Sequence, residues 1–206
     1  MGRAVHQRAL LKGKAVVMTP KRVEETQRQI WAHVLCSECE QRLNRNGENY
    51  VFGLIDNGSS FPLLDKIKHA AQVAADQTVT TFSGSAMGID TDKLAYFALA
   101  LLWKGSVHRW PTLGGQITRV NLRGHKEQIR KYLLGRAGFP SGVVIAAACT
   151  DKASQGLVTS PARFVGQDDN HFSILMRGIW IDVVLWKGTP KRDLRHLCCV
   201  GSDKKV

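Results

Sequence analysis

The chain is poor in acidic residues. Its 206 residues contain 17 Asp and Glu against 29 Lys and Arg, which gives a formal net charge of +12 at pH 7. A surplus of this size attracts polyanions, and nucleic acid is the commonest polyanion that a basic protein meets. The alternatives are an acidic protein surface as partner, or a basic surface that meets only solvent. We expect a partner that is nucleic acid or a nucleoprotein.

Long apolar runs and a cysteine framework are also missing. No run approaches the roughly 20 residues of a membrane span, and Met1 to His6 lacks the apolar core of a signal peptide. Five cysteines form an odd, irregularly spaced set, which argues against a disulfide scaffold. We therefore expect a cytoplasmic protein with no membrane contact.

The familiar catalytic motifs are absent from the sequence. It contains no P-loop, no dinucleotide-binding fingerprint, no G-x-S-x-G elbow and no H-E-x-x-H pair. Leu113-Gly114-Gly115 is typical of a turn rather than of a phosphate-binding loop. Nothing in these motifs indicates catalysis, and the prediction leans towards a protein that is not an enzyme.

Apolar periodicity predicts helices over most of the first two-thirds of the chain. The strongest pattern begins at Thr91 or Asp92 and ends at Val107; it is apolar on nearly all sides, which predicts a buried central helix. Ser37 followed by Glu40 matches a capping box at the start of another helix. Further helices are predicted over 3–12, 38–55, 62–76 and 125–134. Another is predicted from about Val23, with a strand as the alternative for its β-branched end.

The pattern changes after Pro140 to short β-rich segments between Gly, Asp and Asn turns. Strands are predicted over 143–148, 157–159, 162–165, 171–176, 179–186 and 196–200, with shorter ones at 15–18 and 78–82. Met176-Arg177-Gly178-Ile179 predicts a tight turn between paired strands. The predicted class is α+β, with a helical N-terminal two-thirds packed on a mostly antiparallel sheet from the C-terminal third. We expect one domain over 1–206, with sub-regions 1–137 and 138–206.

Cys36 and Cys39 have the spacing of metal ligands. A closed zinc site needs four ligands, usually from a second C-x-x-C pair, and these 206 residues contain no second pair. The pair is therefore compatible with a structural Zn²⁺ completed from elsewhere, with a redox pair, or with two small buried residues at a helix start. A homodimer would complete the site if each subunit contributed Cys36 and Cys39. Distant donors available within the chain are His6, His33, His69, His196, Cys198 and Cys199.

Residues 104–136 contain eight Lys and Arg and a single acid, Glu127. Such a segment can hold phosphates without reading bases, and Trp110 can stack on a base. A solvated basic face and a packing role for Trp110 are the alternatives. The predicted contacts are Arg109, Trp110, Arg119, Arg123, Lys126, Arg130 and Lys131.

Several of these segments together resemble a known family. They are Leu35 to Asn44, Asn46 to Val51, Tyr96 to Lys104, Ser106 to Trp110, and Ile129 to Gly135. Over roughly residues 5–185 they are similar to uncharacterised bacterial proteins related to HNH nucleases. The resemblance implies a zinc-stabilised ββα-metal-like unit and a nucleic-acid context.

The same resemblance implies an earlier C-x-x-C and a Ser-His element near a proline, and neither precedes Cys36 here. HNH chemistry needs a His that activates water, and His6 is the only His near the expected position. We therefore expect a non-cutting derivative. One alternative is an active metal-dependent endonuclease with His6 as general base. Another is a phage- or plasmid-type inhibitor that docks on a protein target, such as a host defence complex.

Overall fold

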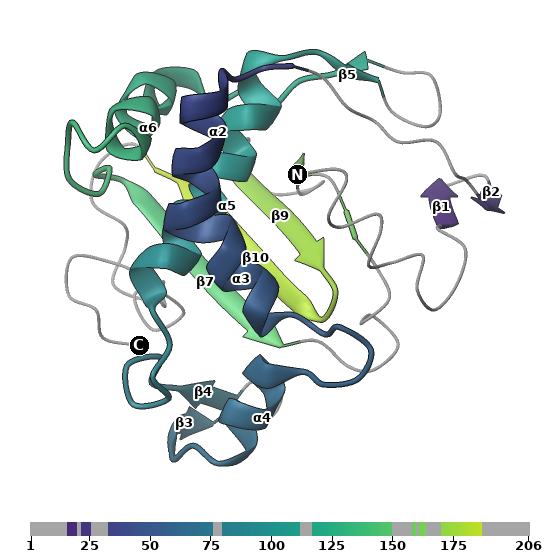
Figure 1. Ribbon diagram of the computed structural model, residues 1–206, viewed down its shortest axis with the longest axis vertical. Helices are drawn as coiled ribbons and strands as arrows, with labels where there is room; N and C mark the ends of the chain where they lie inside the picture. The colour runs from purple at the N-terminus through teal and green to yellow at the C-terminus, as the bar shows by residue number, and fades with distance from the viewer. Residues whose placement is uncertain are drawn as a thin grey trace.

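The computed structural model describes residues 16–19, 22–25, 33–75, 80–111, 117–149, 158–159, 161–163 and 170–186, and these form an α+β structure (Figure 1). The predicted helix over 3–12 and strand over 196–200 lie outside the described residues. Among the helices described, none combines the length and the apolar character that a membrane span requires.

The central helix is α5 (Thr91–Val107). Every residue from Leu94 to Leu102 is buried, as the apolar pattern predicts. At its start the Asp90 side chain accepts a hydrogen bond of 3.0 Å from the Lys93 backbone N–H, which is an N-cap interaction. The predicted boundaries of this helix are confirmed.

A continuous helical segment lies against α5. It consists of α2 (Ser37–Leu43), the π-helical turn η1 (Asn44–Glu48) and α3 (Asn49–Leu54), which confirms the predicted helix over 38–55. Gly47 permits the close packing, because a Cβ atom there would lie 2.9 Å from the backbone N of Phe97 in α5. The predicted capping box is wrong. Cys36 occupies the N-cap position, so Ser37 is already the first helical residue.

Two other helix predictions are wrong because strands pair where the helices were expected. The helix α4 covers Pro62–Lys68, and β3 (Gln72–Ala75) pairs with β4 (Thr80–Phe82) where 62–76 was predicted to remain helical. Val73 is 55% exposed, so it does not belong to the apolar face that the prediction assumed. Likewise β2 (Arg22–Glu25) pairs with β1 (Val16–Thr19), which replaces the start of the helix expected from Val23.

The last third forms an antiparallel sheet in the order β7-β10-β9-β8. Its strands are β7 (Val143–Cys149), β8 (Ala162–Arg163), β9 (His171–Met176) and β10 (Ile179–Leu185). Arg177 and Gly178 both have positive φ, 44° and 89°, as the tight turn between β9 and β10 requires. That predicted turn is confirmed. Of the strand expected over 157–159, the structure describes Val158 and Thr159, and there Val158 forms an isolated bridge with Met176.

One hydrophobic core joins the helices to this sheet. Alternate residues of β10, from Ile179 to Leu185, are buried and share a cluster with Phe97 and Leu102 of α5. In Figure 1, α2, α3 and α5 lie across the face of the sheet formed by β7, β9 and β10. The C-terminal end of α5 and the start of α2 are therefore at the same end of the molecule, beside α6 (Lys126–Leu133).

Candidate nucleic-acid interface

The carbonyl groups at the end of α5 accept hydrogen bonds from the basic segment, residues 104–136. A helix ends with carbonyls that have no partner inside the helix, and here residues 106–126 supply the donors. Ser106 Oγ donates a hydrogen bond to the Trp103 carbonyl. The Trp110 indole N–H donates to the Lys104 carbonyl, and the Val120 backbone N–H donates to the Gly105 carbonyl. Arg119 Nε and Lys126 Nζ both reach the Ser106 carbonyl, at 2.8 and 3.4 Å.

Two predicted phosphate-binding residues, Arg119 and Lys126, are thus brought together at one carbonyl oxygen. The negative end of the α5 dipole stabilises cations at this position. Each side chain uses a single donor for the contact, and a guanidinium or ammonium group carries several. Capping and phosphate binding are therefore compatible for both residues.

The other predicted cations are on or beside α6. Arg123 is in the 3₁₀ turn η2 (Arg123–His125), where its φ of 48° is positive. Arg130 donates two hydrogen bonds of 2.8 Å to Glu127, the one acid of the segment, and these bonds lower the pKa of Glu127. Lys131 is exposed, as is Arg109 just beyond the end of α5.

The orientation of α6 is fixed by contacts at its C-terminal end. The Tyr96 hydroxyl donates to the Leu133 carbonyl at 2.6 Å, and Arg42 Nη1 donates to the Leu134 carbonyl at 2.9 Å. Buried Ile129 and Leu133 anchor its inner side in the core. The cations of α6 therefore project from a rigid support.

Lys104 is the exception among the eight cations of the segment. It is 7% exposed, and its Nζ atom lies 2.9 Å from Glu48 and 3.2 Å from Glu40. Lys104 therefore forms a buried ion pair that holds the helices together, and it is not part of the cationic surface. The cationic surface consists of the other seven residues: Arg109, Arg119, Arg123, Lys126, Arg130, Lys131 and Arg136.

Trp110 lies in β5 (Trp110–Pro111), which pairs with β6 (Ile117–Thr118). Besides its bond to the Lys104 carbonyl, its ring makes an edge contact with His108 at a centroid distance of 4.9 Å. The structure thus gives Trp110 a packing role, and stacking on a base stays a prediction.

Cys36 and Cys39 lie at the start of α2, where Glu40 of the same turn contacts the buried Lys104. Interactions with the Cys39 backbone N–H, the Cys39 thiol and the Glu38 N–H lower the pKa of Cys36. Donation to Cys36, with some burial, raises the pKa of Cys39. Within the described part of the chain, no three His, Cys, Asp or Glu residues form a group that could hold a metal ion.

The remaining predicted donors are scattered or undescribed. His33 is exposed just before α2, and His69 ends α4. His6, His196, Cys198 and Cys199 lie outside the described residues. Within the described residues no further zinc ligand joins Cys36 and Cys39, and the catalytic role of His6 stays a prediction.

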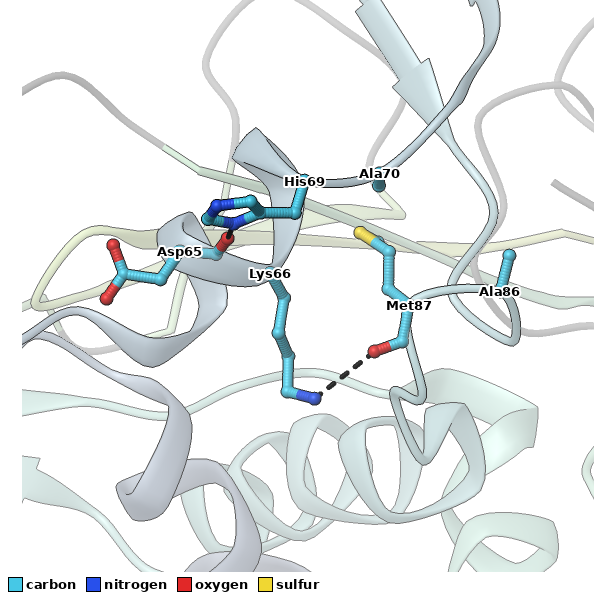
Figure 2. Close-up of a pocket in the computed structure, with 6 residues that line it drawn as sticks. All are labelled: Asp65, Lys66, His69, Ala70, Ala86 and Met87. Atoms are coloured by element: carbon cyan, nitrogen blue, oxygen red, sulfur yellow. Dashed lines mark hydrogen bonds between the residues drawn. The ribbon is translucent and has the colours of Figure 1, made fainter.

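A hollow of about 430 Å³ lies between α4 and the loop that follows β4 (Figure 2). Its polar groups are already occupied: His69 Nδ1 donates to the Asp65 carbonyl at 2.7 Å, and Lys66 Nζ donates to the Met87 carbonyl at 3.2 Å. In Figure 2 the Asp65 carboxylate points away from Met87 and the hollow. The described residues that line this space bring no acid, base and nucleophile together.

The sheet carries a polar group that the sequence analysis missed. Asp182 of β10 accepts a hydrogen bond from Ser173 of β9, and His171 Nε2 lies 3.1 Å from the same carboxylate oxygen. Period-two alternation places His171 and Ser173 on one face of β9, but only the strand register brings Asp182 opposite Ser173. Serine and histidine both contact the carboxylate, so this is not the serine–histidine–aspartate order that activates a nucleophile.

Comparison with protein-family models, curated proteins and solved structures found no match to this chain. The resemblance to HNH-related proteins therefore stays a prediction.

Proposed function

We propose that this protein binds nucleic acid, free or within a nucleoprotein, through phosphate contacts made by the cationic surface around the end of α5. Two observations support the proposal: residues 104–136 hold seven cations besides the buried Lys104 and a single acid, Glu127, and the fold brings two of these cations, Arg119 and Lys126, to the Ser106 carbonyl at the end of α5. Contacts of this kind neutralise phosphates and release counterions, which gives affinity without base specificity.

The proposal extends to the origin and architecture of the chain. A non-cutting relative of HNH nucleases would retain a nucleic-acid surface without a water-activating histidine. We treat 1–206 as one domain in which the helical first two-thirds pack on the β-rich last third. A Zn²⁺ at Cys36 and Cys39 belongs to the same proposed origin and requires ligands outside the described residues or from a second subunit.

The test is a titration of a labelled random-sequence DNA duplex at several salt concentrations. We expect log affinity to fall linearly with log salt. The double variant Arg109→Gln/Lys131→Gln removes two exposed cations, and should reduce the magnitude of the slope by about 2 if each contacts one phosphate.

The matched control is Lys66→Gln/Lys68→Gln, which changes the net charge by the same amount on α4, at the opposite end of the molecule from α6 (Figure 1). Both lysines are exposed; Lys68 pairs with Asp65, and Lys66 donates to the Met87 carbonyl. Equal weakening by the two double variants would show that the overall charge, and not this surface, is responsible. Affinity that does not change between low and moderate salt would overturn the proposal. A protein partner that remains bound after nuclease treatment would favour docking on a protein instead.

A further inference from the structure

The end of α5 brings two cationic side chains to a single oxygen atom. Arg119 Nε lies 2.8 Å and Lys126 Nζ lies 3.4 Å from the Ser106 carbonyl oxygen. The two nitrogens are therefore separated by no more than two hydrogen-bond lengths. Because Ser106 is buried in α5, its carbonyl is a fixed point for both side chains. Two positive charges are thus held at a short and defined separation.

The backbone that carries these two side chains is also fixed. The Val120 N–H donates to the Gly105 carbonyl at 3.0 Å, which ties the residue after Arg119 to the end of α5. Lys126 is the first residue of α6, and Ile129 of that helix is fully buried in the core. A site with rigid supports loses little conformational freedom when a ligand binds.

The charges of Arg119 and Lys126 are not compensated by an acid among the described residues. Glu127, the nearest acid in the sequence, uses both carboxylate oxygens to accept hydrogen bonds from Arg130. Arg119 is exposed, and only its Nε is bonded to the carbonyl. An ammonium group likewise carries more protons than its one contact uses. Both residues therefore retain donors for an anion.

A phosphate at the end of a strand matches this pair of cations better than a phosphate inside the strand. Each internal phosphate of a nucleic acid carries one negative charge. A phosphomonoester carries a charge of about −1.5 to −2 at pH 7 and has three strong acceptor oxygens. One such group can accept charge-assisted hydrogen bonds from Arg119 and Lys126 together. In a nucleic acid, a phosphomonoester is found at the end of a strand.

We propose that Arg119 and Lys126 form a binding site for the terminal phosphate of a nucleic-acid strand. The inference rests on the proposed function, and it specifies which part of the nucleic acid this position of the cationic surface recognises. The other cations of the surface contact internal phosphates next to the strand end. A 5′-phosphate and a 3′-phosphate offer the same chemistry, so the experiment compares them separately.

The test measures the affinity of the full chain for short DNA duplexes of one sequence with an internal fluorescent label. Their ends carry a 5′-phosphate, a 3′-phosphate or hydroxyl groups only. At least one phosphorylated duplex should bind about tenfold more tightly than the hydroxyl duplex, as one additional charge-assisted contact would give. Arg119→Gln and Lys126→Gln should each reduce this preference to about threefold or less. Arg119→Lys keeps a cation at this position and should retain the preference, whereas Arg109→Gln/Lys131→Gln should weaken the binding of all three duplexes equally.

Circular dichroism checks that the variants are folded, and the comparison of the three duplexes with the wild-type protein requires no variant. Salt-dependent binding with equal affinity for all three duplexes would overturn this inference and leave the proposed function intact. Failure to bind any of the duplexes would overturn both. A preference that is unchanged in Arg119→Gln and in Lys126→Gln would show that the terminal phosphate is bound elsewhere, and the proposed site would be wrong.

Discussion

Lys104 is a buried cation among the described residues. Burial of an ammonium group costs several kcal/mol unless a partner compensates the lost hydration. Glu48, 2% exposed, is its closest partner, and Glu40 is a second, more exposed one. Because the three charges sit between η1, α2 and α5, they fix how the helical segment is aligned on the central helix.

The first prediction concerns this ion pair. Glu48→Gln leaves the buried ammonium with only Glu40, and should lower the free energy of unfolding by on the order of 3 kcal/mol. The matched control is Glu127→Gln, which makes the same substitution in an exposed pair and should change stability little. Urea unfolding of the two variants measures the difference. Equal midpoints would mean that the buried pair contributes no more than a surface pair.

The sequence could not separate Lys104 from its neighbours. Eight cations against one acid in 104–136 predicts a basic surface, and seven of the eight are compatible with it. The acids that pair with Lys104 are Glu48 and Glu40, which lie 56 and 64 residues away along the chain. Only the packing of η1 and α2 on α5 identifies these two acids. The sequence likewise does not indicate that Arg119 and Lys126 both contact the Ser106 carbonyl.

At the scale of elements, the π-helical turn η1 is where the helical segment adapts to α5. Its backbone approaches α5 so closely that only glycine fits at position 47: an added Cβ would lie 2.9 Å from the Phe97 N and 3.0 Å from its Cα. Both atoms belong to the backbone of a buried helix, so neither can move aside. The turn also directs Glu48 into the interior.

The second prediction is that Gly47→Ala destabilises the protein by about 1–3 kcal/mol, because the two helices must separate to admit the methyl group. Gly53 of α3 is the matched control. It has nothing within 4 Å of an added Cβ, so Gly53→Ala should be neutral or stabilise by up to about 1 kcal/mol. Chemical denaturation compares them. A Gly47→Ala variant as stable as Gly53→Ala would contradict the close approach.

Helices and strands could be predicted where the apolar pattern is long. The predictions were wrong where pairing with a short strand determines whether a segment is helix or strand. The pattern of 91–107 predicts α5, and β-rich segments joined by a turn predict β9 and β10. By contrast, residues 72–75 form β3 because β4 is available to pair with them. The π-helical character of 44–48 depends on contact with α5 and has no counterpart in the apolar pattern.

At the scale of the whole molecule, the helices and the main sheet share one core. The same cluster includes Val51 of α3, Leu102 of α5, Ile129 of α6 and Ile181 of β10, all essentially inaccessible to solvent. Elements that bury their apolar faces against each other lose that stabilisation together when one of them opens. The described helices and sheet should therefore unfold as one cooperative unit.

The third prediction tests this unit with a cavity in α5. Leu102→Ala should cost about 2–5 kcal/mol, and should accelerate global amide hydrogen exchange in β10 as much as in α5, although the substitution is made only in the helix. Val73→Ala in the β3–β4 hairpin is the control, because Val73 is 55% exposed and does not belong to the cluster. Hydrogen exchange followed by mass spectrometry reads both elements in one experiment. Faster exchange confined to α5, with β10 unchanged, would mean that the helices and the sheet are separately stable units, and the cationic surface would then rest on the helical unit alone.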